Sequence, residues 1–353
     1  MSPPPNCVTP LPSRPSGGGL PRWHGDGLAG SSLRFTATAM APMAAGLALH
    51  QNDWVGYALL ATILGFTLDT GGTARHRAAL FAIAGLVVVA GAACGTLVAG
   101  HVWLTGAALV ATATLYALVE AVHPSAAFAA RFLCLTTAIA ALNVPFLPRD
   151  VAVVAIFAAY AWMVSVGWDM MTGLWRPSTS PTLAAIAAHL RANRRQRLLF
   201  AAIVAVAVAA AFAVGRMLGL PYPQWAVFAV VLVVSDDAHF SRQAMVNLVL
   251  GTVLGAGVAF LYGALVTSPT GLMVGLTLTA LARWPGQRLH GSLGTAAMAV
   301  FIILLLQLVG TLIATPIHAA AIRVVDVMLG CAFALAALVV NERLRAWLGW
   351  QPA

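Results

Sequence analysis

Lysine is absent from this sequence of 353 residues, and all nineteen basic residues are arginine. A Walker A loop needs a lysine to hold nucleotide phosphates, and an enzyme that works through a Schiff base needs an amine. The sequence also contains no HExxH or GxSxG motif, the patterns typical of zinc proteases and α/β-hydrolases. We therefore expect a protein that is not an enzyme and has no catalytic residues.

Charge of either sign is scarce. Only 8% of the residues are charged, whereas 61% are hydrophobic and the mean hydropathy is +0.90. A soluble domain carries about 25% charged residues because its surface faces water. The composition therefore predicts an all-α polytopic membrane protein whose outer surface contacts the lipid bilayer. The net charge of +9 comes from arginines between long apolar runs, so we expect no nucleic-acid partner.

Cysteine is scarce as well. The four cysteines are far apart, and no two of them have the spacing of a metal or redox site: Cys7, Cys94, Cys134 and Cys331. The histidines are scattered without ligand spacing. We expect neither a metal ion nor another cofactor.

The apolar runs predict about twelve transmembrane helices. A bilayer core of about 30 Å requires roughly twenty helical residues, and every backbone polar group must be satisfied within the segment. The spans are expected near residues 33–49, 54–68, 78–99, 102–122, 126–147, 151–173, 198–218, 224–235, 245–266, 270–284, 292–314 and 318–340.

The arginines indicate the orientation. With the N-terminus inside, fifteen of the nineteen fall on the cytoplasmic side, only Arg149 and Arg216 fall on the opposite side, and Arg131 and Arg323 lie within spans. This asymmetry agrees with the positive-inside rule and places both termini in the cytoplasm of a bacterial inner-membrane protein.

The spans divide into two halves. We expect a disordered, Pro- and Gly-rich cytoplasmic tail at 1–32, a six-helix half at 33–173, a basic linker at 174–197, a second six-helix half at 198–340 and a C-terminal tail at 341–353. Six is an even number, so the two halves enter the membrane in the same direction and form a parallel repeat.

Short motifs recur at corresponding places in the halves. Trp54 and Trp225 each open a short apolar run, and each run is followed by aspartate, by arginine and then by a long span. That span carries a GxxxG pair, Gly91 with Gly95 and Gly251 with Gly255. Small residues at this spacing let two helix backbones approach closely. Glycine is common here, so chance pairs are the alternative.

The second half contains four distinctive motifs: PYPQWA at 221–226, SDD at 235–237, LGTVLG at 250–255 and RVVDVMLG at 323–330. As a set they resemble the fusaric acid resistance (FUSC) family of integral membrane transporters. The resemblance covers residues 198–340 well and 33–173 more loosely. It implies efflux of small organic anions such as aromatic carboxylic acids, with protons as the coupling ion.

Two residues of the last span are the first candidates for a site. Arg323 and Asp326 are three residues apart and share a helix face, and charge inside a membrane is costly enough to indicate function. Arg323 is a candidate for binding the substrate carboxylate, and Asp326 for proton coupling. The alternative is a structural ion pair.

The short spans supply further candidates. Short segments at corresponding places in two halves hint at broken helices around a substrate site, where Trp54 and Trp225 would stack on an aromatic ring. Interfacial anchoring is the alternative for both tryptophans. Asp69, Asp236 and Asp237 lie near predicted cytoplasmic helix ends, as do Glu120 and Asp169. They read as an inner gate or proton-access point, or as structural partners of nearby arginines.

The expected function is therefore secondary export of small organic anions. A non-transporting membrane scaffold or envelope-assembly factor is the main alternative, and an intramembrane enzyme is a weaker one. Besides lipid and the anion, the partners left open are a second copy of the chain and a periplasmic adaptor subunit.

Overall fold

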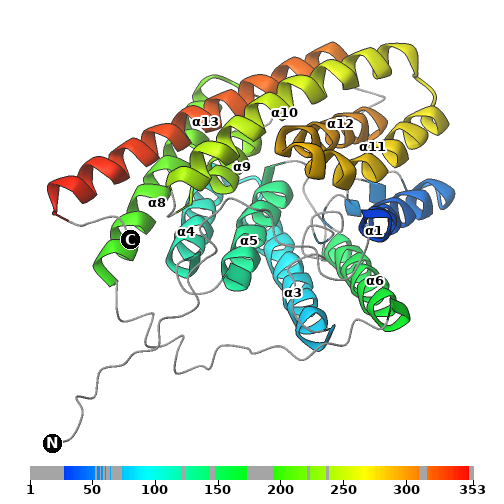
Figure 1. Ribbon diagram of the computed structural model, residues 1–353, viewed down its shortest axis with the longest axis horizontal. Coiled ribbons are helices and arrows are strands. Elements are labelled where there is room, and N and C mark those ends of the chain that lie inside the picture. Colours follow the sequence, from blue (N-terminus) through cyan, green and yellow to red (C-terminus); the bar gives the residue numbers. More distant parts are fainter. Residues whose placement is uncertain are drawn as a thin grey trace, which may run out of the picture.

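A computed structural model describes most of the chain as helix (Figure 1). The described residues are 28–51, 54, 55, 57, 58, 60, 64, 74–120, 124–142, 148–172, 194–220, 223–235, 238–309 and 316–349; within helices, the side chains at 74, 76, 124–128, 142, 148, 172, 238–240 and 316–323 are excluded. These residues form helices and turns, and none of them is in a strand. The predicted all-α fold is confirmed.

The helices follow the apolar runs of the sequence. They are α1 (Leu28–Ala48), α3 (Ala74–Val98), α4 (Val102–Glu120), α5 (Pro124–Leu142), α6 (Pro148–Thr172), α8 (Arg194–Met217), α9 (Gln224–Val233), α10 (Ala238–Leu265), α11 (Pro269–Leu289), α12 (Gly291–Val309) and α13 (Pro316–Trp347). A further segment, only partly described, begins at Trp54.

Seven helices within the described residues are long and apolar enough to cross a membrane. They are contained in α3, α4, α6, α8, α10, α12 and α13, with 19–25 residues each. The chain is therefore a multi-pass membrane protein, as the composition predicts. Twelve spans in two six-helix halves stay a prediction.

Several helices extend beyond the apolar runs that mark them in the sequence. Helix α10 begins at Ala238, seven residues before the predicted span, and α13 continues to Trp347. The apolar length reflects lipid thickness, whereas a helix continues as long as its backbone bonds and side chains favour it. The extensions of α10 and α13 meet in an ion pair, where Arg242 lies 3.0 Å from Glu342.

Helix α9 is short and lies in the interior. It starts directly after Pro223 and ends at Val233, because Val234 adopts an extended conformation. Ten residues span about 15 Å, half of the hydrocarbon thickness. Every residue of α9 except Leu232 is buried. The predicted short run at 224–235 therefore corresponds to a helix that neighbouring helices, not lipid, surround.

The helices pack in a pattern that recurs along the chain. Helix α3 packs on α5 and α6, and α10 packs on α12 and α13. Figure 1 shows α13 running beside α10. Helix α4 packs on α5, and α11 packs on α12. Two further contacts join the parts before and after residue 194, namely α4 with α8 and α1 with α11.

The first GxxxG pair lies at the contact of α3 with α5. A Cβ atom built at Gly95 would stand 2.6 Å from both the Cβ of Ala140 and the carbonyl oxygen of Thr137. One turn earlier, Gly91 faces Thr136 in the same way. These distances are shorter than any real Cβ contact, so glycine is what permits the approach.

The second GxxxG pair permits the same close approach between α10 and α12. A Cβ atom at Gly255 would stand 2.6 Å from the Cβ of Ala299 and from the carbonyl oxygen of Ala296. Gly251 faces Thr295 one turn away. The predicted close approach is confirmed for both pairs, and each glycine pair meets a threonine and an alanine four residues apart.

Candidate functional site

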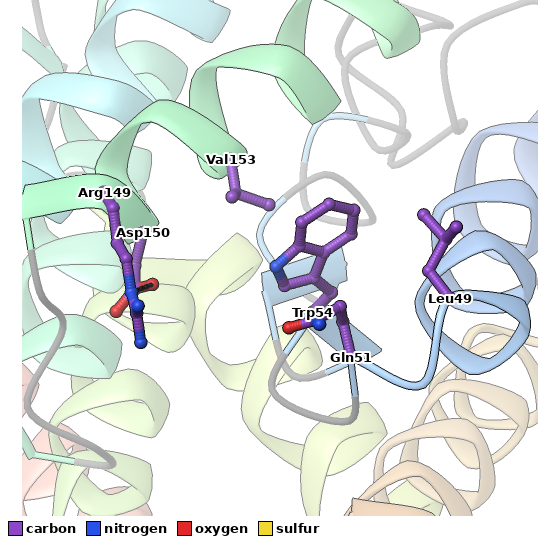
Figure 2. A pocket seen from close by; sticks show the side chains of 6 residues that line it. All are labelled: Leu49, Gln51, Trp54, Arg149, Asp150 and Val153. Atoms are coloured by element: carbon purple, nitrogen blue, oxygen red, sulfur yellow. Dashed lines mark ion pairs between the residues drawn. The ribbon is translucent and has the colours of Figure 1, made fainter.

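A pocket of about 500 Å³ opens where α1 ends and α6 begins (Figure 2). Its wall combines residues from the turn after α1, from the segment that starts at Trp54 and from the first turns of α6. The lining residues are Leu49, Gln51, Trp54, Arg149, Asp150 and Val153. It therefore joins an indole ring, an amide, a guanidinium group and a carboxylate.

A tight turn after α1 sets the position of the indole. His50 has a positive φ of 56°, an unusual conformation for a residue with a side chain. The N–H of Gln51 donates to the carbonyl of Gly46 at 2.8 Å, and the N–H of Trp54 donates to the carbonyl of Gln51 at 3.0 Å. The Cβ of Trp54 lies so close to Gly46 that a Cβ atom there would stand 3.1 Å away.

The ring of Trp54 packs against α6. Its edge meets the ring of Phe157 on α6, with centroids 6.1 Å apart and planes at 82°. Edge-to-face packing of this kind fixes the orientation of an aromatic ring. Figure 2 shows the indole between Leu49 and Val153, with its surface turned into the pocket. A planar ligand would find a ready surface here.

The charged side of the pocket is the start of α6. The Arg149 side chain is 80% exposed, and its Nε lies 3.7 Å from a carboxylate oxygen of Asp150. Asp150 is buried in the first turn of α6, where a carboxylate interacts favourably with the helix dipole. Because the guanidinium is exposed and the contact is as long as 3.7 Å, the pair contributes little, and the guanidinium is free to approach the carboxylate of a ligand.

The structure places the predicted site residues in different surroundings. Trp54 lines the pocket, whereas Trp225 is only 5% exposed and packs edge-on against Phe228, with centroids 4.9 Å apart. Asp326 is fully buried in α13. Asp69, Asp236 and Asp237 lie outside the described residues. So does the side chain of Arg323, although its backbone belongs to α13.

Arg149 was not among the predicted site residues. In the sequence it is only one of two arginines predicted on the side opposite the termini. Its position directly before a helix start and next to Asp150 was a usable signal, but nothing in the sequence linked it to Trp54, which is 95 positions earlier.

Buried carboxylates at helix ends are paired with arginines, as predicted. Asp169 near the end of α6 lies 3.2 Å from a guanidinium nitrogen of Arg34 and also contacts Arg77. The side chains of Arg34 and Asp169 are 1% and 3% exposed. Three helices, α1, α3 and α6, therefore meet at one carboxylate. Glu120 likewise pairs with Arg131, at 2.8 Å.

Metal binding has no support in the described residues, where no three His, Cys, Asp or Glu side chains come together.

Residues 208–337 match the sequence profile of a family described as fusaric acid resistance protein-like. The match begins within α8 and ends within α13, so the resemblance noted in the sequence is confirmed for this region. No curated protein and no solved structure matches the chain.

Proposed function

We propose that this membrane protein is a bacterial inner-membrane secondary transporter that exports small organic anions such as aromatic carboxylic acids, since residues 208–337 match the fusaric acid resistance protein-like family. The single observation that carries the proposal is the pocket, in which Trp54 offers an aromatic face and Arg149 a cation. Ring and carboxylate are the two groups that define the proposed substrate class.

The proposed architecture is a pair of six-helix repeats that enter the membrane in the same direction. Three recurrences support it. The packing of α3, α5 and α6 resembles that of α10, α12 and α13, and α3 and α10 each carry a glycine pair that faces a threonine and an alanine. In each proposed half, an ion pair also joins the start of this long helix to the end of the last helix. Those pairs are Arg77 with Asp169 and Arg242 with Glu342.

The proposed direction follows from charge and orientation. With both termini in the cytoplasm, the arginine-rich helix ends face inward and the pocket lies on the outer side. An inside-negative potential assists the expulsion of an anion and opposes its uptake. The pocket would then be the last binding site before release.

Other residues complete the proposal. Arg323 would attract the carboxylate within the membrane, Asp326 on the same face would take part in proton coupling, and Trp225 would contribute to the substrate path. Asp326 is buried one turn before Gly330, which packs tightly on Ala229 of α9. A buried carboxylate at a close helix contact is a suitable place to sense protonation.

Asp69, Asp236 and Asp237 are proposed as the inner gate, near the predicted cytoplasmic ends of the short spans. Their positions directly after the apolar runs that Trp54 and Trp225 open are the basis of this assignment.

Transport by the purified full-length protein in proteoliposomes tests the pocket. We expect Trp54→Ala and Arg149→Gln each to raise the KM for benzoate roughly tenfold, because each removes one of the two recognition groups. Trp103→Ala and Arg216→Gln are the matched controls, since both side chains are exposed at helix ends and are predicted to lie on the outer side.

If the two control variants raise the KM for benzoate as much as the two pocket variants do, the pocket is not the substrate site. Absence of benzoate flux in the wild-type protein, with and without a pH gradient, would contradict aromatic acid export and leave the scaffold alternative. Flux that ignores the pH gradient would contradict proton coupling alone. Arg323→Ala and Asp326→Asn belong in the same series, and intact export in both would end their assignment.

A further inference from the structure

The first turn of α8 contains an arginine that is almost fully buried. Arg197 is only 8% exposed, and its Nε donates no hydrogen bond to any residue that the structure describes. Burying a cation is costly unless an anion or another acceptor compensates it. Long side chains of a helix point back toward its N-terminus, so the guanidinium of Arg197 is directed to the end of α8 and not to the middle of the membrane. The start of α8 is therefore a place where an anion would be stabilised.

The end of α4 lies at the same end of the helix bundle. Helices α4 and α8 pack along each other and run antiparallel, since Gly106 near the start of α4 faces Phe212 near the end of α8. The last turns of α4 also reach the end of α9, where the hydroxyl of Tyr116 donates to the carbonyl of Val234. The start of α8 and the ends of α4 and α9 therefore gather together.

The start of α10 and the end of α13 join this gathering. The N–H of Ser235, two residues after α9, donates to the hydroxyl of Ser241 in the first turn of α10 at 2.9 Å. Arg242, the next residue, pairs with Glu342 near the end of α13 at 3.0 Å. Helix α13 also packs on α8, and Figure 1 shows the start of α8 and the end of α13 on its left side. The arginine pattern predicts that this end of the molecule faces the cytoplasm.

Arginine exceeds carboxylate at this end. Three arginines come from the start of α8 and two from the end of α13, namely Arg194, Arg195, Arg197, Arg343 and Arg345. The described carboxylates nearby are Glu120 and Glu342, and each already pairs with another arginine, Arg131 and Arg242 respectively.

The other carboxylates of neighbouring helices are distant or already engaged. Asp326 precedes Glu342 by sixteen positions, which is about 24 Å along α13. Asp169 on α6 contacts two arginines, from α1 and α3. Asp236 and Asp237 lie outside the described residues. The described part of the chain therefore leaves an excess of positive charge where α8 starts and α13 ends.

Each of these two helices also presents an exposed apolar stripe that leads up to an arginine. Residues three or four positions apart share a helix face. The exposed residues at this spacing are Leu198, Ala202 and Val206 after Arg195 on α8, and Ala336 and Val339 before Arg343 on α13. Trp347 at the end of α13 is 82% exposed, and tryptophan is enriched where a membrane meets water. The surface therefore offers cations at the headgroup level and apolar side chains below them.

We infer that the start of α8 and the end of α13 form a binding site for an anionic phospholipid. The guanidinium groups of Arg195, Arg197 and Arg343 donate to the phosphate oxygens, because the planar guanidinium matches phosphate geometry. The acyl chains lie along the two apolar stripes. Free phosphate would use the arginines alone, whereas the stripes add contacts that only a lipid can make. The site goes beyond the proposed transport function and does not depend on it.

Native mass spectrometry of the purified full-length protein in detergent provides the test. The protein is titrated with phosphatidylglycerol or with phosphatidylcholine, and the apparent Kd of the first bound lipid is measured. We expect the wild type to bind phosphatidylglycerol about tenfold more tightly than the zwitterionic lipid. Arg195→Gln, Arg197→Gln and Arg343→Gln should each weaken phosphatidylglycerol binding about fivefold and leave phosphatidylcholine binding unchanged.

Arg216→Gln is the matched control. It removes the same charge from an exposed arginine of the same helix, at the opposite end of α8, so its affinity for phosphatidylglycerol should equal that of the wild type. If Arg197→Gln fails to fold, Arg195→Gln and Arg343→Gln still decide, because both side chains are exposed.

Glycerol 3-phosphate separates a lipid site from a phosphate site, because it carries the phosphate without acyl chains. At a concentration equal to that of phosphatidylglycerol, we expect it to displace none of the bound lipid. Displacement at that concentration would overturn the inference of a lipid site. Equal affinity of the wild type for the two lipids would overturn it as well, and so would a loss in Arg216→Gln as large as that in Arg195→Gln.

Discussion

Two glycines of α10 allow the close packing against α12 to be tested within one helix. Gly255 is buried at the contact, whereas a Cβ atom built at Gly257 has no described atom within 4 Å. Both positions lie in the middle of the helix. Alanine at each gains the same intrinsic helix propensity over glycine, about 1 kcal/mol. Any difference between Gly255→Ala and Gly257→Ala therefore reports the contact with α12.

The structure gives the size of the expected difference. The added Cβ atom at Gly255 would stand 2.6 Å from the carbonyl oxygen of Ala296, which is 0.8 Å short of the 3.4 Å where ordinary contact begins. The opposing atom is backbone, so it cannot rotate away and α12 has to move. Overpacking of this kind costs about 1–3 kcal/mol. We expect Gly255→Ala to be less stable than Gly257→Ala by that amount.

Equilibrium unfolding in mixed micelles of dodecyl maltoside and SDS measures the difference, with tryptophan fluorescence as the signal. Gly257→Ala should be as stable as the wild type or slightly more stable, because its methyl group adds only helix propensity. The reasoning is refuted if Gly255→Ala is as stable as Gly257→Ala, since the two backbones would then not approach as closely as described.

The same unfolding assay checks three further contacts. Asp169→Asn removes a carboxylate from a buried arginine and should cost about 3–5 kcal/mol of stability. Glu342→Gln should change stability by less than about 1 kcal/mol, because its ion pair is exposed. Similar costs for the two variants would contradict this ranking. Gly330→Ala should destabilise the protein by about 1–3 kcal/mol, since its Cβ atom would stand 2.6 Å from that of Ala229 on α9. An unchanged unfolding midpoint would show that α9 and α13 are less tightly packed than described.

Helix positions and close contacts were predictable because they follow from local patterns. Apolar length marks a helix in lipid, and the GxxxG spacing places two small residues on one face. The partners of Gly91 and Gly251 were not predictable in the same way. Thr136 and Thr295 are ordinary residues of apolar helices, and only the packing of α3 on α5 and of α10 on α12 selects them.

The candidate site was predictable only in part, because its residues come from distant segments. Trp54 was selected by its place in the predicted repeat, but its counterpart Trp225 proved to be buried against Phe228. Similar sequence positions thus lead to different surroundings, since the turn at His50 exposes one ring and the packing of α9 covers the other. Only the fold shows that Arg149 lines the same pocket as Trp54.

The buried cluster of Tyr116, Glu120 and Arg131 illustrates the same limit at short range. Glu120 and Arg131 are eleven positions apart on consecutive helices, so their pairing could be anticipated from charge. The hydrogen bond from the Tyr116 hydroxyl to Val234 could not be anticipated, because a tyrosine in an apolar run has no distinguishing pattern. Its partner is a backbone carbonyl, which no side-chain motif marks.

The burial of α9 changes what membrane residence demands of its sequence. A helix that meets acyl chains can exchange leucine, isoleucine and valine freely, because all three dissolve in lipid. Ala226 and Ala229 instead face Gly330, where there is room only for a side chain of their own volume. In a scan of single substitutions, these two positions should accept serine more readily than leucine, while the exposed Leu254 and Val258 of α10 should show the reverse order.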